Sequence, residues 1–241
     1  MNNPGKTYMN WSGGKDSALC LHRVLQENSH DVGCLLTSIN THHDRISMHG
    51  VRRELLEAQA TAMNYPLETV ELSEQPDMKE YEHAMNTRIS SLRARGYSKA
   101  LFGDIFLEDL KRYREQQLAA HGIECLFPLW KESTIALVRE FIGLGFKAII
   151  VCVNEKYLDR SFCGRLIDET FLADLPANAD PCGENGEYHS FVFEGPVLKY
   201  PIPFQKGDIV RRQYADPGNT AGHDSLNGDL GFFFADLLPV Q

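Results

Sequence analysis

The sequence lacks the features of a secreted, membrane-spanning or cysteine-stapled protein. Residues 1–11 contain no apolar core of a signal peptide, and no apolar run in the 241 residues approaches the roughly 18 that span a bilayer. Six widely spaced cysteines include no C-x-x-C pair, so neither a structural zinc site nor a disulfide framework is expected. These absences favour a location in the reducing cytoplasm.

Positive charge is also in deficit. The chain has 24 Lys and Arg against 33 Asp and Glu, a formal net charge of −9 with neutral histidines. A surface that holds nucleic acid by general electrostatics is therefore not expected, and a small ligand or a basic protein surface fits better. The residues are 43% hydrophobic and 24% charged, which is typical of a globular domain and excludes a disordered tail or a fibrous repeat.

The order of apolar segments predicts an α/β fold with a Rossmann-like parallel sheet flanked by helices. Between residues 7 and 153, short apolar runs alternate with longer amphipathic stretches, as in repeated strand-helix units. The runs 32–36 and 148–153 are apolar at every position, so we expect them at the sheet centre, covered on both faces. The other expected strands are 8–11, 67–72, 100–102 and 125–127, and the expected helices cover 51–63, 78–95 and 107–121, with a further helix ending at Gly143 or Gly145.

The composition changes after Val153. Prolines and glycines become frequent, the apolar runs become short and aromatic, and helices are not expected there. The segments 191–193, 209–214 and 231–235 are expected to be strands. We therefore predict two domains, a nucleotide-binding domain over 1–175 and a small β-rich lobe over 176–241.

Residues 12–17, with the sequence SGGKDS, lie between the first expected strand and the first helix. The adjacent Gly13 and Gly14 let the backbone turn sharply and approach a ligand, and the helix start offers unpaired N–H donors and a positive dipole to an anion. Lys15 adds a mobile positive charge, and the hydroxyls of Ser12 and Ser17 can donate to phosphate oxygens. The segment therefore predicts a phosphate-binding loop.

Other interpretations of this loop are weaker. The glycines that G-x-x-x-x-G-K-[ST] requires upstream are missing, which excludes a P-loop NTPase, and the segment is not G-x-G-x-x-G either. An ordinary glycine turn with Ser12 as the helix N-cap is the structural alternative. Asp16 either holds Mg²⁺ or caps the helix.

The SGGKDS loop resembles the pyrophosphate loop of the ATP pyrophosphatases, which cleave ATP between its α and β phosphates. Further motifs, spread over roughly residues 7 to 198, resemble the diphthine ammonia ligase family in particular. These motifs are Met48-His49-Gly50, Phe102-Gly103-Asp104-Ile105, residues 107–114 (LEDLKRYR), Pro128-Leu129-Trp130 and residues 180–191 (DPCGENGEYHSF).

The resemblance implies a fold, a reaction and partners. The fold is an adenine-nucleotide α-hydrolase domain, followed by a smaller lobe that brings the G-E-x-G-E segment to the active cleft. The family reaction activates the carboxylate of diphthine, a modified histidine of a translation elongation factor, as an acyl-adenylate, and ammonia converts it to an amide. ATP leaves as AMP and pyrophosphate, Mg²⁺ assists, and free ammonia or another amine is expected because the chain has no glutaminase pattern.

Such chemistry needs positive charge at the phosphates and polar groups that orient a carboxylate and an amine. Asp104, at the end of an expected strand, either faces the ligands or caps a helix, and His189 is a further candidate for orienting the substrates. The expected catalytic residues are Lys15, Asp104, Glu184, Asn185 and Glu187. The expected ATP-binding residues are Ser12, Gly13, Gly14, Lys15, Asp16, Ser17, Ser38, His49 and Gly103, with Asp16 as the metal ligand.

Three alternatives remain open at this level. The same ATP chemistry can adenylate a small carboxylic acid, or it can modify tRNA by thiolation or a lysidine-like reaction, although the net charge of −9 and the missing cysteine pair count against tRNA. A protein that binds ATP without cleaving it is the third, against which the intact Lys15 and Ser17 argue. The oligomeric state is left open, a homodimer included.

Overall fold

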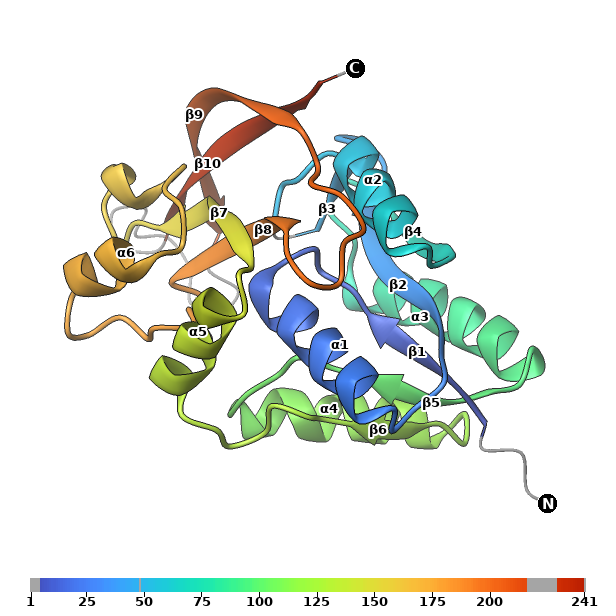
Figure 1. Ribbon diagram of the computed structural model, residues 1–241. Coiled ribbons are helices and arrows are strands. Elements are labelled where there is room, and N and C mark those ends of the chain that lie inside the picture. Colours follow the sequence, from blue (N-terminus) through green and yellow to red (C-terminus); the bar gives the residue numbers. More distant parts are fainter. Residues whose placement is uncertain (1–4, 48, 216–228, 241) are drawn as a thin grey trace.

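The computed structural model describes residues 5–47, 49–215 and 229–240. Two sheets lie side by side, and helices cover the larger of them on both faces (Figure 1). This is the α/β, Rossmann-like architecture with a smaller β-rich lobe that the sequence predicts. The strands of the larger sheet are β1 (Lys6–Asn10), β2 (Val32–Asn40), β3 (Arg45–Ile46), β4 (Leu67–Leu72), β5 (Tyr97–Leu101) and β6 (Glu124–Leu126).

Strand β1 occupies the middle of the larger sheet. It pairs in parallel with β2 on one side and β5 on the other, β4 and β6 continue the parallel sheet outward, and β3 is antiparallel to β2. The polar end of β1 is accommodated because the Asn10 side chain donates to the carbonyl of Leu101, at 3.1 Å. The loop that follows β1 thus starts at the carboxyl edge of the sheet, where ligands of parallel α/β sheets bind.

Six α-helices lie in the described part of the chain, and those expected at 51–63, 78–95 and 107–121 begin and end within two residues of these bounds. They are α1 (Lys15–Glu27), α2 (Arg53–Met63), α3 (Met78–Ala94), α4 (Glu108–Ala119), α5 (Thr134–Gly143) and α6 (Glu169–Asp174), with one 3₁₀ turn, η1 (Arg160–Phe162). The last two were not expected after Val153. The helix α6 forms because the Asp168 carboxylate accepts from the backbone N–H of Phe171, at 2.8 Å, and because the Phe171 side chain is buried.

The second sheet corrects the expectation for residues 148–153. These residues form β7 (Lys147–Asn154), which lies between β8 (Tyr188–Glu194) and β10 (Asp229–Pro239) in an antiparallel sheet completed by β9 (Phe204–Ala215). An apolar run at every position reports burial on both faces, and it does not report which sheet supplies the neighbours. The strands expected at 191–193, 209–214 and 231–235 are confirmed within β8, β9 and β10.

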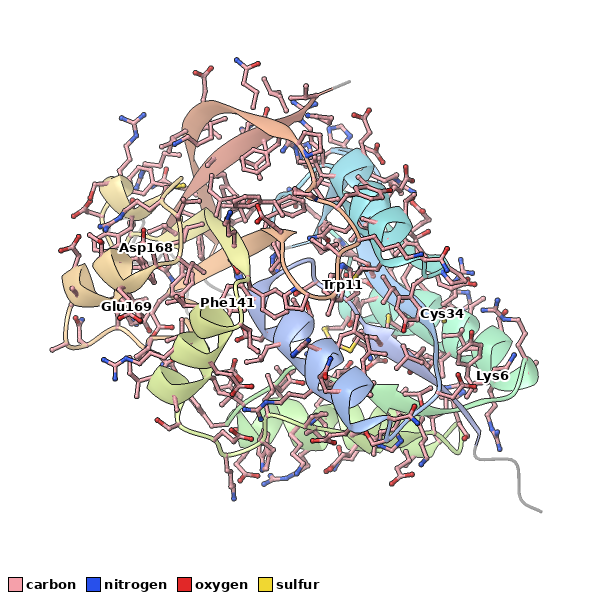
Figure 2. The ribbon with its side chains drawn as sticks, viewed as in Figure 1. Lys6, Trp11, Cys34, Phe141, Asp168 and Glu169 are labelled. Atoms are coloured by element: carbon pink, nitrogen blue, oxygen red, sulfur yellow. The ribbon has the colours of Figure 1, made fainter. Side chains whose placement is uncertain are left out.

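Apolar packing joins the two sheets. One core cluster holds the buried faces of α1, α2 and α5 together with β7 and β8, and it includes the large side chains of Trp11 and Phe141 (Figure 2). A second cluster lies between the opposite face of the larger sheet and helices α3 and α4. The smaller sheet contains β7, from before residue 176, as well as β8, β9 and β10, from after it. The proposed domain boundary at 175/176 stays a prediction.

All six cysteines are free thiols, and the described helices include none that is both long and apolar enough to cross a membrane.

Candidate active site

The SGGKDS segment forms a tight turn between β1 and α1. Gly13 has a φ of +78°, and Gly14 is the N-cap residue of α1, which has no side-chain cap. The hydroxyl of Ser12 accepts from the N–H of Gly14 (3.2 Å) and lies 3.2 Å from the hydroxyl of Ser17. Ser12 is therefore not the helix N-cap, and the N-cap residue, Gly14, has no side chain to cap the first turn of α1, which starts at an edge where anions bind.

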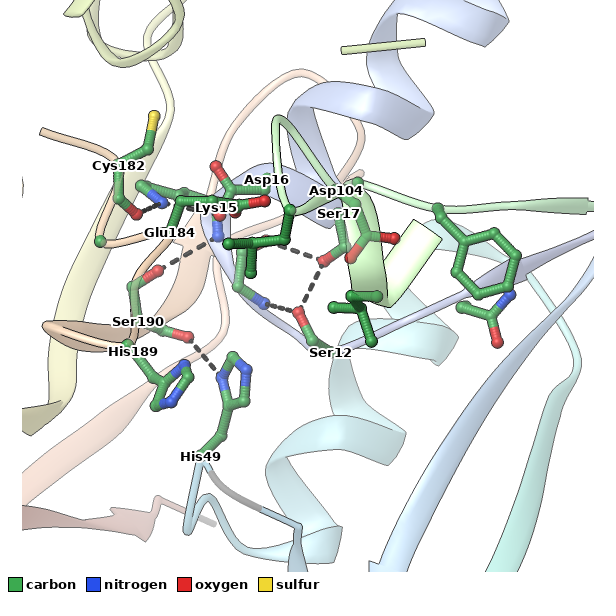
Figure 3. A pocket seen from close by; sticks show the side chains of 18 of the residues that line it. Ser12, Lys15, Asp16, Ser17, His49, Asp104, Cys182, Glu184, His189 and Ser190 are labelled. Atoms are coloured by element: carbon green, nitrogen blue, oxygen red, sulfur yellow. Dashed lines mark hydrogen bonds and ion pairs between the residues drawn. The ribbon is translucent and has the colours of Figure 1, made fainter. Parts of the chain in front are cut away.

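A cavity of about 250 Å³ opens beside this turn, between the carboxyl edge of the larger sheet and the segment 182–190 (Figure 3). Nine of the predicted site residues line it. They are Ser12, Gly14, Lys15, Asp16, Ser17, His49, Gly103, Asp104 and Glu184. The fold thus brings together residues from four separate segments of the chain.

Lys15 is buried at the base of this cavity, with only 4% of its side chain exposed. Its ammonium lies 2.7 Å from the Asp16 carboxylate, donates to the carbonyl of Cys182 and faces the ring of Tyr188 at 5.3 Å. Burial acts to lower the pKa of Lys15, but the Asp16 carboxylate and its other neighbours outweigh it and raise that pKa above its ordinary value. The cavity therefore holds a permanent positive charge.

Carboxylates surround the same cavity. Burial raises the pKa of Asp16, Asp104 and Glu184, and the charge of Asp16 adds to this effect at both Asp104 and Glu184. Arg114 holds Asp104 by two contacts, of 3.0 and 3.1 Å, and the N-cap of α4 is Leu107, so Asp104 does not cap that helix. Clustered carboxylates with raised pKa values fit a divalent cation with oxygen ligands, and Asp16 and Glu184 are the side chains that suit Mg²⁺.

Glu184 joins the smaller lobe to the larger sheet. Its carboxylate accepts from the backbone N–H groups of Ile105 (2.7 Å) and Phe106 (3.4 Å), just after β5. Burial raises the pKa of Glu184 to about 7, although the hydrogen bond from Ile105 acts in the opposite direction. A carboxyl group with this pKa exists in both protonation states near neutral pH, which suits proton transfer.

This raised pKa predicts a pH-dependent stability. Because the folded-state pKa of Glu184 exceeds the unfolded value of 4.5, the folded protein binds more protons between pH 4.5 and 7, and this carboxyl group lowers stability as pH rises through that window. We expect the melting temperature of Glu184→Gln, relative to the wild type, to rise from pH 4.5 to 7 and then level off. Thermal melts across this range test the prediction, with Glu57→Gln on α2 as the control. A flat difference would contradict the raised pKa.

Two expected catalytic residues do not line the cavity. Glu187 is fully buried, and its carboxylate accepts from the N–H of Asp180 (2.9 Å), the N–H of Asn185 (2.9 Å) and the side-chain amide of Asn185 (3.0 Å). Gly183, with a φ of +71°, packs against Tyr188, where an added Cβ would lie 2.9 Å from the ring. In this geometry Asn185 and Glu187 shape the loop 180–187, and their catalytic roles stay predictions.

Two glycines make the close approaches on which the cavity depends. A Cβ on Gly103 would lie 2.9 Å from the backbone of Asp16, so only glycine lets the loop after β5 pack this tightly on α1. Gly13 does not line the cavity, because its carbonyl faces inward and accepts from the N–H of Val192 (2.9 Å) and from Gln59 (3.1 Å). These contacts fix the loop against β8 and α2.

Arg114, Cys182, Tyr188 and Ser190 are among the cavity residues that were not expected as catalytic or ATP-binding residues. All four lie inside the segments 107–114 and 180–191, whose resemblance to the family could have identified them as site residues. Ser190 accepts from the N–H of Lys15 through its hydroxyl, at 3.1 Å, and so connects β8 directly to the glycine turn. The hydroxyl of Tyr188 donates to the carbonyl of Pro181, at 2.6 Å, and so ties the start of β8 to the loop 180–187.

A second cavity of about 440 Å³ continues from the first toward helices α3 and α4. Ser38, at the end of β2, lines this cavity and not the first one, together with apolar side chains such as Leu36, Val70 and Ile89. The two cavities share seven lining residues: Asn10, Ser12, His49, Phe102, Leu110, Arg114 and His189. The two cavities therefore meet at a common mouth, and the charged side chains of Lys15, Asp16, Asp104 and Glu184 line only the first.

His49 and His189 lie at this mouth with their ring centroids 4.6 Å apart (Figure 3). Nδ1 of His49 is 3.2 Å from the carbonyl oxygen of Ser190. Burial lowers the pKa of His49 to about 4, and it lowers that of His189 well below its ordinary value, with Lys15 adding to both effects. Met48, the first residue of this motif, lies outside the described residues.

Within the described ranges, the one close group of three metal-ligating side chains lies away from both cavities. The ligand atoms of His42, His43 and Glu74 all lie within 4.8 Å of one another on the exposed surface. The carboxylates of the cavity are not grouped as closely.

The fold and the cavity define a class of protein, an α/β protein with an anion-binding turn facing a carboxylate-rich cleft between two lobes. Comparison with known proteins narrows this class. Residues 5–124 match the model of the diphthamide synthase N-terminal domain, and residues 133–215 match that of the diphthamide synthase C-terminal domain. The chain belongs to the diphthamide synthase family.

Curated relatives carry the name diphthine–ammonia ligase. The zebrafish (Danio rerio) protein is 25% identical over 223 residues, which cover 83% of this chain and 86% of the relative. The human protein is 29% identical over 110 residues, which cover 43% of this chain and 41% of the relative, and the Schizosaccharomyces pombe protein is 27% identical over 93 residues, covering 37% and 15%. The match to the human protein thus spans less than half of its length.

Proposed function

We propose that this protein is an ATP-dependent amide-forming ligase that adenylates a carboxylate and transfers ammonia to it, releasing AMP and pyrophosphate, with diphthine on a translation elongation factor as the acceptor. One observation carries the proposal: the buried ammonium of Lys15 faces the same cavity as Glu184, whose pKa is raised to about 7. Fixed positive charge suits the adenylation step, and a titrating carboxyl group in the same cleft suits the transfer of ammonia. Family membership supports this chemistry.

The two joined cavities suit the two ends of ATP. The smaller one, with the glycine turn and Lys15, offers donors and charge for the phosphates. The larger one offers apolar walls for the nucleoside, with Ser38 at the end of β2 as a polar contact. In this arrangement the α phosphorus lies near the shared mouth, where the carboxylate acceptor enters.

Adenylation builds negative charge on the departing pyrophosphate as a carboxylate oxygen attacks the α phosphorus. The Lys15 ammonium and the positive end of the α1 dipole stabilise that charge. Mg²⁺, held by Asp16 and Glu184, supplies further charge neutralisation when bound. Ser190 and Cys182 keep Lys15 and the turn in place through their contacts with its N–H and its ammonium.

The test supplies the protein with ATP, Mg²⁺, ammonium and an elongation factor that carries diphthine. We expect AMP and pyrophosphate only when the acceptor is present, and mass spectrometry of the acceptor should show conversion of its carboxyl group to a carboxamide. Release of ADP would contradict the proposal, and so would a melting temperature that rises with ATP in a protein without any turnover. Turnover with a small carboxylic acid but not with the elongation factor would support the adenylation reaction and exclude diphthine as the acceptor. Labelling of tRNA would favour an RNA-modifying enzyme.

The proposed reaction places the protein in the cytoplasm, where ATP and translation factors are present. Six free thiols and the lack of a membrane-spanning helix in the described part of the chain are compatible with that location.

A further inference from the structure

The mouth shared by the two cavities is where the acyl-adenylate would react. The α phosphate of ATP lies between pyrophosphate and nucleoside, so the activated carboxyl carbon, bonded through oxygen to that phosphate, sits at the junction of the two cavities. This step rests on the proposed function. The polar side chains common to both cavities are Asn10, Ser12, His49, Arg114 and His189.

Three of these five groups are already engaged. The amide of Asn10 donates to the carbonyl of Leu101, the guanidinium of Arg114 is held by Asp104, and the hydroxyl of Ser12 accepts from the N–H of Gly14. An amide, a guanidinium and an alcohol are also not proton acceptors of useful strength near neutral pH. The two imidazoles are the remaining bases at the mouth.

The hydrogen bond of His49 fixes which of its nitrogens is free. The carbonyl of Ser190 can only accept, so Nδ1 of His49 must carry the proton of this bond. In the neutral ring Nε2 then has an unshared electron pair. The ring stays neutral because burial and the positive charge of Lys15 both lower the pKa of His49, and the same two factors, with His49 itself, lower that of His189.

We propose that His49 and His189 form the subsite for the incoming amine, with Nε2 of His49 as the atom that holds an N–H of ammonia and takes its proton. The two uncharged rings offer hydrogen-bond acceptors and no negative charge, so the subsite they form suits neutral ammonia and not ammonium. Accepting one N–H also orients the nitrogen lone pair away from the ring and toward the activated carbon.

The resulting step balances. The lone pair of the amine nitrogen forms the new C–N bond, and the bond between the carbonyl carbon and the phosphate oxygen breaks with its electrons leaving on AMP. The proton lost from nitrogen passes to Nε2 of His49 and from there to water. No oxidant, reductant or further reactant is required.

Assays of the two half-reactions distinguish a role in amine transfer from a role in activation of the carboxylate by ATP. With the diphthine-bearing elongation factor and ATP but no amine, exchange of labelled pyrophosphate into ATP reports adenylation alone. With ammonium added, carboxamide formation reports both steps. We expect His49→Gln to lower amide formation relative to pyrophosphate exchange by roughly 100-fold, the usual effect of removing a positioned base. His189→Gln removes the ring that packs on His49, so it should lower the same ratio by a smaller factor.

Hydroxylamine provides an internal rescue. It is uncharged at neutral pH and attacks acyl groups without help from a base, so both variants should form hydroxamate much closer to the wild-type rate than they form amide. His43→Gln, an exposed histidine that lines neither cavity, is the matched control and should leave both half-reactions unchanged. Retained exchange shows that a variant is folded.

Each outcome decides the matter. If both variants lose amide formation only by the factor by which they lose pyrophosphate exchange, the amine subsite is overturned and the ligase function is retained. Absence of acceptor-dependent exchange in the wild-type protein would overturn the proposed function and the subsite together. A selective loss of amide formation, rescued by hydroxylamine, supports the subsite.

Discussion

Replacing Lys15 with alanine is expected to lower the rate of AMP and pyrophosphate formation by roughly 100-fold or more, the effect of removing one charge-stabilising donor from a transition state. The ammonium is buried, lines the cavity and belongs to the first residue of α1. Negative charge that develops on pyrophosphate would then lack the ammonium beside the glycine turn. Steady-state assays of pyrophosphate release with the elongation factor acceptor measure the effect.

The substitution also removes the partner of Asp16, so folding must be measured beside activity. Lys131→Ala is a suitable control, because the Lys131 side chain is 67% exposed, pairs with Glu108 on the surface and lines neither cavity. We expect this control to retain full activity, since exposed ion pairs contribute little. A Lys15→Ala protein that melts like the wild type and turns over ATP at an undiminished rate would exclude the glycine turn as the phosphate site.

Replacing Glu187 with alanine is expected to lower the free energy of unfolding by roughly 3 kcal/mol, because a buried acceptor of three N–H groups is lost. Glu187→Gln keeps one carbonyl oxygen and the shape of the side chain, so its cost should be clearly smaller. Urea denaturation measures both, with the exposed Glu57→Ala on α2 as the control.

The same pair of variants distinguishes a structural role for Glu187 from the catalytic role that the sequence suggested. If Glu187 shapes the loop 180–187, activity should follow stability, and Glu187→Gln should recover most of it. A Glu187→Gln protein with wild-type stability and no activity would instead place the carboxylate in the reaction itself.

Much of the fold could be predicted because local patterns record local physics. Periods of 2 and 3.6 residues identify strands and helices, and they gave the bounds of α2, α3 and β4 to within two residues. The pattern was insufficient for β7, because an apolar run reports how deeply a strand is buried and not which strands it pairs with. It was also insufficient for α6, whose formation depends on the cap from Asp168 and on burial of Phe171.

The site divides in the same way. The glycine turn was evident from residues 12–17, because adjacent glycines, a lysine and a helix start act over one short segment. What only the tertiary structure decided is the other wall of the cavity. Ser190, 175 residues beyond Lys15, accepts from its N–H, and Glu184 reaches the backbone after β5.

The sequence by itself therefore determined most of the helices and strands and the phosphate-binding turn, since these depend on neighbours in the chain. The tertiary structure decided that His49 meets His189, that Glu187 turns inward while Glu184 faces the cavity, and that β7 joins the smaller sheet. Those outcomes depend on packing between segments far apart in sequence, and local periodicity carries no information about such pairings.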